Sequence, residues 1–438
     1  MGFKNEIDEI IKTPSLKNAH IGVLVETDEK IIYELNSEDL FIPASNLKLF
    51  TSATILNILQ PNFRIETWFF GTTRVRGGEL NGSLVIRAGG DPTFSRTRLE
   101  KIVTGLSKKL RKVNEGVILD LSVFDKEYVN PYWEKEDLEH SYAPRIVPFT
   151  LERGLIKIKV YPTELGLKPR IIVEPFNSYI KIENNARTVS GKVNQISVEK
   201  KPGENSFVVK GEIGLEVEEL VFEKPIEEPH LYATEYLKHL MVKHGIKVKG
   251  EVREGVLEDG VLLAMDISRP LSDLNKILLK FSDNALAEYF TKILGYYELG
   301  EGSWIKGLKV MRSYLKQLGI DVTKLKIVDG SGLSRDNRVT PRIIVDFLKR
   351  FQRNRFFKYF YTALPVAGID GTLRDRMKNT IAEGRIRAKT GTLRDVVALS
   401  GYATCLSGKK AFFSIIINEH KSKSLSLIHI SEPTRPRL

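Results

Sequence analysis

The stretch Pro43-Ala44-Ser45-Asn46-Leu47-Lys48 opens a mostly apolar segment that continues to Leu59 and stops before Pro61. This pattern predicts a helix over 45–59. Residues three apart lie on one face of a helix, so the Ser45 hydroxyl and the Lys48 amine can meet. A serine hydroxyl becomes a good nucleophile when a base removes its proton, and a lysine can be that base when burial or a second cation lowers its pKa. The segment therefore predicts a buried helix that carries a serine nucleophile and its base.

Two further strings hold residue types that fit the same chemistry. Ser282-Asp283-Asn284 opens a second helical stretch, and Lys389-Thr390-Gly391 lies at the end of a β-rich run. Lys389 could be the second cation, and the N-terminus of the Ser45 helix offers backbone N–H groups that favour an oxyanion. Each string alone also has a purely structural interpretation, because Ser and Asp are common N-caps and Lys-Thr-Gly can simply end a strand.

The elements around these strings predict an α+β fold with a long insertion. Short β-rich runs near the N-terminus and three consecutive antiparallel strands near the C-terminus could share one sheet, which would bring the two ends of the chain together. Between them, residues 154–222 alternate Val/Ile-rich runs with turn residues and predict a small all-β unit. The expected strands are 20–25, 31–35, 65–70, 74–75, 84–88, 385–392, 396–404 and 411–418, and the expected helices are 99–110, 232–244 and 271–318 with breaks near 282 and 300.

Composition excludes several classes of protein. The 438 residues are 42% hydrophobic and 28% charged, which excludes a disordered or fibrous chain. The single cysteine, Cys405, excludes an internal disulfide framework, and the seven scattered histidines show no metal-ligand spacing, so we expect no metal and no cofactor. No apolar run is long enough for a membrane span, and the charged start lacks the pattern of a signal peptide. The net charge of +12 fits an anionic partner such as wall polymer, but it is spread along the chain and no motif indicates nucleic-acid binding.

The three strings in this order are the signature shared by class A β-lactamases and penicillin-binding proteins. The chain resembles the D-alanyl-D-alanine carboxypeptidase/endopeptidase family, the class C low-molecular-mass penicillin-binding proteins. That resemblance also rests on residues 89–93 (Gly-Gly-Asp-Pro-Thr), 329–334 (Asp-Gly-Ser-Gly-Leu-Ser), 364–373, 387–393 and 399–402. It implies a serine β-lactamase/transpeptidase-like domain, an antiparallel sheet flanked by helices, formed by 1–68 and 265–424. The insertion would then be an α/β domain (69–153 and 223–264) with the all-β domain 154–222 nested in it.

The resemblance also implies roles for individual residues. Ser45 would be acylated, with Lys48 as its general base. Ser282 would relay a proton to the leaving D-alanine, and Asn284 would hold the amide backbone of the substrate. Lys389 would support the Ser282 proton path and, with Thr390, Gly391 and Thr392, bind the terminal carboxylate, while the N–H groups of Ser45 and Thr392 would form the oxyanion hole. The implied substrates are peptidoglycan stem peptides outside the cytoplasm, and β-lactams are the implied inhibitors.

Other interpretations remain open at this level. The same Ser/Lys scaffold serves β-lactamases and esterases, and a non-catalytic wall-binding relative could keep the fold. Carboxypeptidase and endopeptidase activities share one mechanism, so the sequence does not separate them. Residues 425–435 (Leu-Ser-Leu-Ile-His-Ile-Ser-Glu-Pro-Thr-Arg) resemble a translated sequencing-library adapter, so we expect 425–438 to be a non-native tail.

Overall fold

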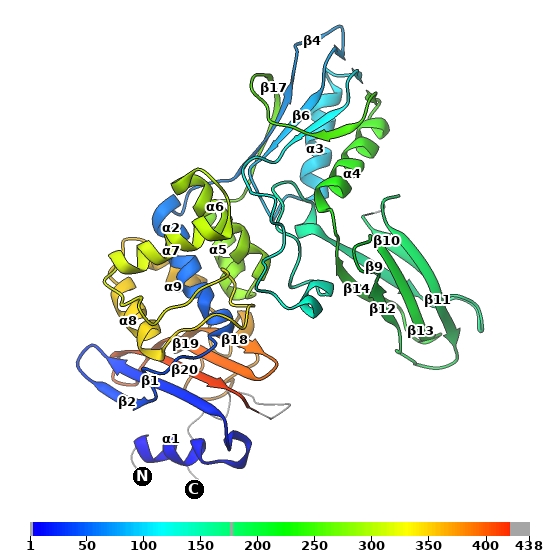
Figure 1. Cartoon of the computed structure of the whole chain (residues 1–438). Coiled ribbons are helices and arrows are strands. Elements are labelled where there is room, and N and C mark those ends of the chain that lie inside the picture. The colour runs from blue at the N-terminus through cyan, green and yellow to red at the C-terminus, as the bar shows by residue number, and fades with distance from the viewer. Residues whose placement is uncertain (1–2, 176–177, 421–438) are drawn as a thin grey trace. The chain divides into compact units, whose positions relative to one another are not determined.

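The computed structural model describes residues 3–175 and 178–420, which form two compact units (Figure 1). Unit 1 contains the residues up to Phe63, the short segment Asn130–Trp133 and the residues from Arg269 onward. Unit 2 contains Arg64–Val129 and Glu134–Ser268. The sequence did not indicate that Asn130–Trp133, in the middle of the insertion, belongs with unit 1. The expected tail, 425–438, lies outside the described residues.

Unit 1 is built on a five-stranded antiparallel sheet in the order β18-β19-β20-β1-β2. Strands β1 and β20 pair from His20 opposite Asn418 to Thr27 opposite Ala411, which confirms that the two ends of the chain share one sheet. Of the three inner strands, β19 and β20 are buried along almost their whole length, since helices cover both faces of the sheet. The strands are β1 His20–Thr27, β2 Ile31–Leu35, β18 Ile386–Leu393, β19 Val396–Thr404 and β20 Lys410–Asn418.

Helices α1 and α8 lie on opposite faces of this sheet, and the other helices of unit 1 gather on the α8 side (Figure 1). Ile7 and Ile11 of α1 pack onto the apolar cluster that includes Val23, Leu399 and Ile415. Helix α2 is buried over Lys48–Leu56, because α5, α6, α7 and α9 surround it. The helices are α1 Phe3–Ile11, α2 Lys48–Leu59, α5 Leu271–Lys280, α6 Asn284–Leu299, α7 Trp304–Gln317, α8 Pro341–Phe351 and α9 Phe357–Ala363.

Helices α6 and α7 cross so closely that a glycine is needed at their contact. A Cβ placed on Gly307 would lie 1.8 Å from the carbonyl oxygen of Thr291. We expect Gly307→Ala to push the two helices apart and to lower the free energy of unfolding by about 1–3 kcal/mol. Gly105→Ala is the matched control, because Gly105 lies on the exposed side of helix α3 and a Cβ there would meet open space. This variant should raise the free energy of unfolding by about 0.5–1 kcal/mol. Urea denaturation of both variants measures the difference, and equal stabilities would contradict this account of the crossing.

Unit 2 contains a mixed five-stranded sheet, β16-β8-β6-β3-β17, and a four-stranded sheet, β15-β7-β5-β4. Helices α3 Arg96–Ser107 and α4 Pro229–Lys243 pack with these strands around one apolar core. The strands are β3 Glu66–Gly71, β4 Val75–Arg76, β5 Glu79–Leu80, β6 Leu84–Ala88, β7 Lys112–Val113, β8 Val117–Asp120, β15 Lys247–Val248, β16 Val252–Glu254 and β17 Val261–Ile267.

The remaining strands of unit 2 form two three-stranded sheets, β10-β9-β14 and β11-β13-β12, around a core of their own. Apart from the pair β11 and β13, which is parallel, the strands in these two sheets pair antiparallel. The strands are β9 Leu155–Tyr161, β10 Arg170–Glu174, β11 Lys181–Val189, β12 Ser197–Lys200, β13 Ser206–Gly214 and β14 Leu220–Pro225. The division of the insertion into separate domains stays a prediction.

Candidate active site

Ser45 lies in a short 3₁₀ turn, Ala44–Leu47, and α2 begins only at Lys48. The helix expected over 45–59 is therefore a 3₁₀ turn that continues into an α-helix. In a 3₁₀ turn, residues three apart are eclipsed, and the Lys48 Nζ donates to the Ser45 Oγ at 2.8 Å. The turn is fixed to the sheet, because the Asn46 amide donates to the Ser400 hydroxyl on β19 at 2.8 Å. The sheet and α2 therefore position the serine and the lysine together.

The Lys48 side chain is completely buried and donates to three acceptors. Besides the Ser45 hydroxyl, these are the Asn284 Oδ1 at 2.6 Å and the backbone carbonyl of Ser331 at 2.7 Å. Burial lowers the pKa of Lys48 to about 8, although the carboxyl groups of Asp329, Glu288 and Asp283 act in the opposite direction. A lysine in this setting loses its proton far more readily than one in water.

A second serine–lysine pair lies beside the first. Ser282 has a left-handed backbone conformation between α5 and α6, with φ of 57°. Asp283 caps α6 by accepting from the Leu286 N–H at 2.9 Å. Lys389 is buried on β18 and donates to the Ser282 Oγ at 2.8 Å and to the Thr390 carbonyl at 2.7 Å. The structure thus brings Ser45, Lys48, Ser282, Asn284 and Lys389 into one cluster, in which Lys48 bonds to Ser45 and Asn284, and Lys389 bonds to Ser282 near enough to be affected by the charge of Lys48.

The surroundings of the two lysines differ in a way the sequence did not indicate. Burial lowers the pKa of Lys389, and so does the nearby charge of Lys48. Three carboxyl groups favour the charged form of Lys48, whereas none is among the causes of the shift at Lys389. The nearby carboxyl groups therefore distinguish the surroundings of Lys48 from those of Lys389.

The expected carboxylate-binding residues lie on β18, which is the edge strand of the sheet. The Thr390 hydroxyl donates to the Thr372 hydroxyl at 2.7 Å, and the Thr392 side chain is exposed. Gly391 lies against the Ser45 turn, since a Cβ there would be 3.0 Å from both the Ala44 Cβ and the Pro43 carbonyl oxygen. An edge strand beside a nucleophile can bind an extended peptide by strand addition.

Two buried carboxyl groups near Lys48 were missed by the sequence analysis. Glu288 on α6 accepts from the N–H groups of Gly330 and Ser331 at 3.0 and 2.7 Å. Asp329 accepts from the N–H groups of Gly332 and Ser334 at 2.8 and 2.7 Å. Burial raises the pKa of both. One signal was available in the sequence, because Glu288 lies four residues after Asn284 and so on the same face of the helix.

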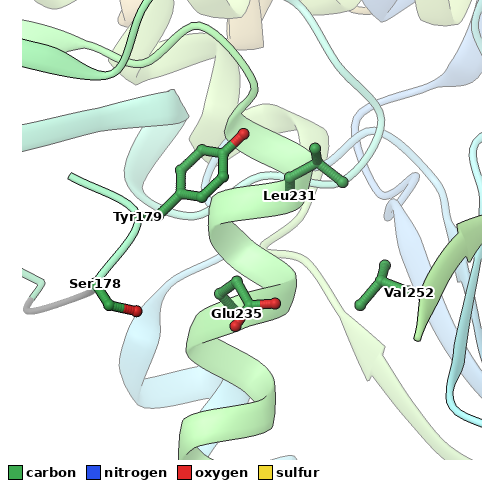
Figure 2. A pocket seen from close by; sticks show the side chains of 5 residues that line it. All are labelled: Ser178, Tyr179, Leu231, Glu235 and Val252. Carbon is green, nitrogen blue, oxygen red and sulfur yellow. The ribbon is translucent and has the colours of Figure 1, made fainter. Parts of the chain in front are cut away.

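A pocket of about 350 Å³ lies elsewhere, in unit 2, and none of the expected site residues lines it. Its lining residues are Ser178, Tyr179, Leu231, Glu235 and Val252 (Figure 2). Within residues 3–175 and 178–420, no group of three or more His, Cys, Asp or Glu side chains could hold a metal ion. In the same part of the chain, no helix has the length and apolar character needed to cross a membrane.

A buried lysine bonds to a serine three residues earlier, beside a second serine whose lysine lies on an edge strand. This arrangement defines the class of active-site serine enzymes that includes penicillin-binding proteins and β-lactamases. Within this class, the chain belongs to the D-Ala-D-Ala carboxypeptidase 3 (S13) family, whose profile its sequence matches over residues 3–430. This finding confirms the family and the fold class expected from the sequence.

Individual relatives agree with this assignment. A D-alanyl-D-alanine carboxypeptidase from an Actinomadura species is 32% identical and covers 95% of this chain and 81% of the relative. The D-alanyl-D-alanine carboxypeptidase DacB of Haemophilus influenzae is 26% identical and covers 93% of this chain and 87% of the relative. The crystal structure of penicillin binding protein 4 from Haemophilus influenzae matches with a TM-score of 0.86 at 25% identity, over 97% of each chain.

Proposed function

We propose that this protein removes the terminal D-alanine from peptidoglycan stem peptides through an acyl-enzyme on Ser45, and that it does so outside the cytoplasm, where this polymer lies. The observation that carries the proposal is the 2.8 Å contact between the Ser45 hydroxyl and the buried Lys48 amine. Membership of the carboxypeptidase family supports the substrate. The relative from Haemophilus influenzae that is named a penicillin binding protein supports inhibition by β-lactams.

The first half of the reaction makes the acyl-enzyme. The neutral Lys48 amine takes the proton of the Ser45 hydroxyl as Oγ attacks the carbonyl carbon of the penultimate D-alanine. The negative charge that develops on the carbonyl oxygen is stabilised by the backbone N–H groups of Ser45 and Thr392. The C–N bond then breaks, and D-alanine leaves after its nitrogen receives a proton through Ser282, which Lys389 contacts at 2.8 Å.

The second half releases the shortened peptide. A water molecule gives a proton to the neutral Lys48 amine and attacks the ester carbonyl. The bond to Oγ then breaks, and Oγ takes that proton from Lys48, which restores the Ser45 hydroxyl. Until D-alanine leaves, the peptide lies extended along β18, with its terminal carboxylate near Lys389, Thr390, Gly391 and Thr392, and the remaining acyl part stays along β18 in the second half. The close packing of β18 against the Ser45 turn at Gly391 supports this position.

Incubation with benzylpenicillin followed by intact-mass measurement tests the proposal. We expect the mass to increase by that of one benzylpenicillin, since ring opening on Ser45 loses no atoms, and the adduct to persist for at least many minutes. A parallel assay should detect free D-alanine from a peptide ending in D-Ala-D-Ala. Rapid turnover of benzylpenicillin without D-alanine release would instead indicate a β-lactamase. A folded protein that gives neither an adduct nor D-alanine would overturn the proposal.

A further inference from the structure

The hydrogen-bonding capacity of Lys48 restricts how its amine can face Ser45. A neutral amine has two N–H donors and one lone pair. The Asn284 Oδ1 and the Ser331 carbonyl oxygen lie 2.6 and 2.7 Å from the Lys48 Nζ, and both are acceptors only. When these two oxygens take the two N–H groups, the lone pair is left to face the Ser45 hydroxyl. The position of the Ser331 carbonyl therefore matters for proton transfer.

That carbonyl belongs to the segment Asp329–Ser334, here called the 329–334 loop, which is held by carboxyl groups rather than by regular structure. The Glu288 carboxyl accepts from the first half of the loop, at the N–H groups of Gly330 and Ser331. The Asp329 carboxyl accepts from the second half, at the N–H groups of Gly332 and Ser334. Both carboxyl groups are also fixed from outside, by Trp304 Nε1–H at 2.6 Å and Trp133 Nε1–H at 3.1 Å respectively.

The 329–334 loop also contacts α2, which carries Lys48, and the short turn that carries Ser45. The Thr51 hydroxyl, one turn after Lys48 on α2, donates to the Gly330 carbonyl at 2.6 Å. A Cβ on Gly332 would lie 1.9 Å from the carbonyl oxygen of Ala44, the residue before Ser45. A shift of the loop would therefore change the distance between the Ser331 carbonyl and the Lys48 amine.

We propose that the 329–334 loop orients the Lys48 amine toward Ser45, and that Thr51, Glu288 and Asp329 are its positioning residues. None of the three touches the reacting atoms, and all three hold the loop that carries the Ser331 carbonyl. The charges of Glu288 and Asp329 also favour the charged form of Lys48, so a slower acylation after loss of the Glu288 charge would run against that electrostatic effect. This inference rests on the proposed function, because it assigns a role in the activation of Ser45. It gives a function to a segment that the sequence marked only through its resemblance to the family.

Two isosteric substitutions on α2 test the inference. The Thr51 and Thr54 side chains are both buried and both donate to a backbone carbonyl, but the Thr54 hydroxyl bonds to Phe50 within its own helix at 2.8 Å. We expect Thr51→Val to lower the rate constant of acylation by benzylpenicillin about tenfold, while the binding constant of the intact drug stays unchanged. Thr54→Val should leave both constants within about twofold of the parent protein, because its bond does not reach the loop.

Two additional variants separate an effect on the orientation of the Lys48 amine from a loss of protein stability. Thr51→Ser keeps the hydroxyl and should restore the acylation rate, whereas a role limited to packing would not be rescued by the smaller side chain. Glu288→Gln turns an amide NH₂ toward the N–H groups of the loop, so we expect about a hundredfold slower acylation with the drug-binding constant retained. Thermal denaturation confirms that each protein is folded.

The outcomes distinguish this inference from the function on which it rests. A parent protein that is never acylated overturns the proposed function itself. A parent protein that is acylated, with equal rate constants for Thr51→Val and Thr54→Val, overturns the role of the loop. A weaker binding constant with an unchanged acylation rate constant would also overturn it, since the loop would then act on the ligand and not on Lys48.

Discussion

Ser45→Ala is expected to abolish the adduct with benzylpenicillin and to lower D-alanine release by about 10³-fold or more. The substitution removes the atom that would form the acyl bond, and no other group in the hydrogen-bonded cluster can replace it at the same position. The fold should persist, because the Lys48 amine keeps its bonds to Asn284 and to the Ser331 carbonyl. Intact-mass measurement and a D-alanine assay check both effects.

Ser52→Ala is the matched control for this variant. Ser52 is buried on the same helix, and within the described part of the chain its hydroxyl oxygen has no hydrogen-bond partner. It should therefore lose neither the adduct nor the activity. If Ser45→Ala were still acylated while remaining folded, the nucleophile would have to be another serine of the cluster, and Ser282 would be the first to replace.

Much of unit 1 could be predicted from the sequence because its elements have clear local patterns. The alternation of apolar residues marked β1, β2 and the last three strands, and the breaks at Ser282 and Gly300 marked the ends of the helices between them. Helix α8 was missed although Thr340 caps it and Pro341 occupies its first turn, which are ordinary helix-start signals. The helical type at Ser45 could not be predicted, since a spacing of three residues fits both an α-helix and a 3₁₀ turn.

Some residues of the site could be predicted from local patterns, whereas others act through contacts that form only in the folded protein. Ser45, Lys48, Ser282, Asn284 and Lys389 could be selected because they occur in three short strings with recognisable residue types. The spacing of four residues puts Glu288 on the Asn284 face of its helix, but the contacts of Glu288 and Asp329 with backbone N–H groups of a loop follow no spacing rule. The contact between Trp133 and Asp329 could be predicted even less, because the two residues are 196 positions apart along the chain.

The different surroundings of the two lysines have a consequence for the pH dependence of acylation. Lys48 must be neutral to accept the Ser45 proton, so its pKa of about 8 should set the rise of the acylation rate with pH. A ligand carboxylate beside Lys389 raises the pKa of that lysine by attraction, and a charged Lys389 in turn lowers the pKa of Lys48. Binding of a carboxylate beside Lys389 would thus favour the neutral form of Lys48.

Lys48→Met is expected to lower the acylation rate constant by about 10²–10⁴-fold, which is the usual contribution of a general base. In the parent protein, the second-order rate constant, which reports the free protein, should rise about tenfold per pH unit below about 8 and level off above it. The rate constant at saturating drug reports the complex, so its rise should lie at lower pH. In Lys48→Met, both rises should disappear, because the group that must lose a proton is gone.

Lys200→Met provides the control for removing a buried lysine as such. Lys200 is buried in unit 2, where burial also lowers its pKa to about 8, but it pairs with Glu227 and no expected site residue contacts it. Its replacement should leave the pH profile of acylation unchanged even if stability falls. A pH rise that persists in Lys48→Met would assign the base to Lys389 instead, and the orientation of the Lys48 amine by the 329–334 loop would then have no part in catalysis.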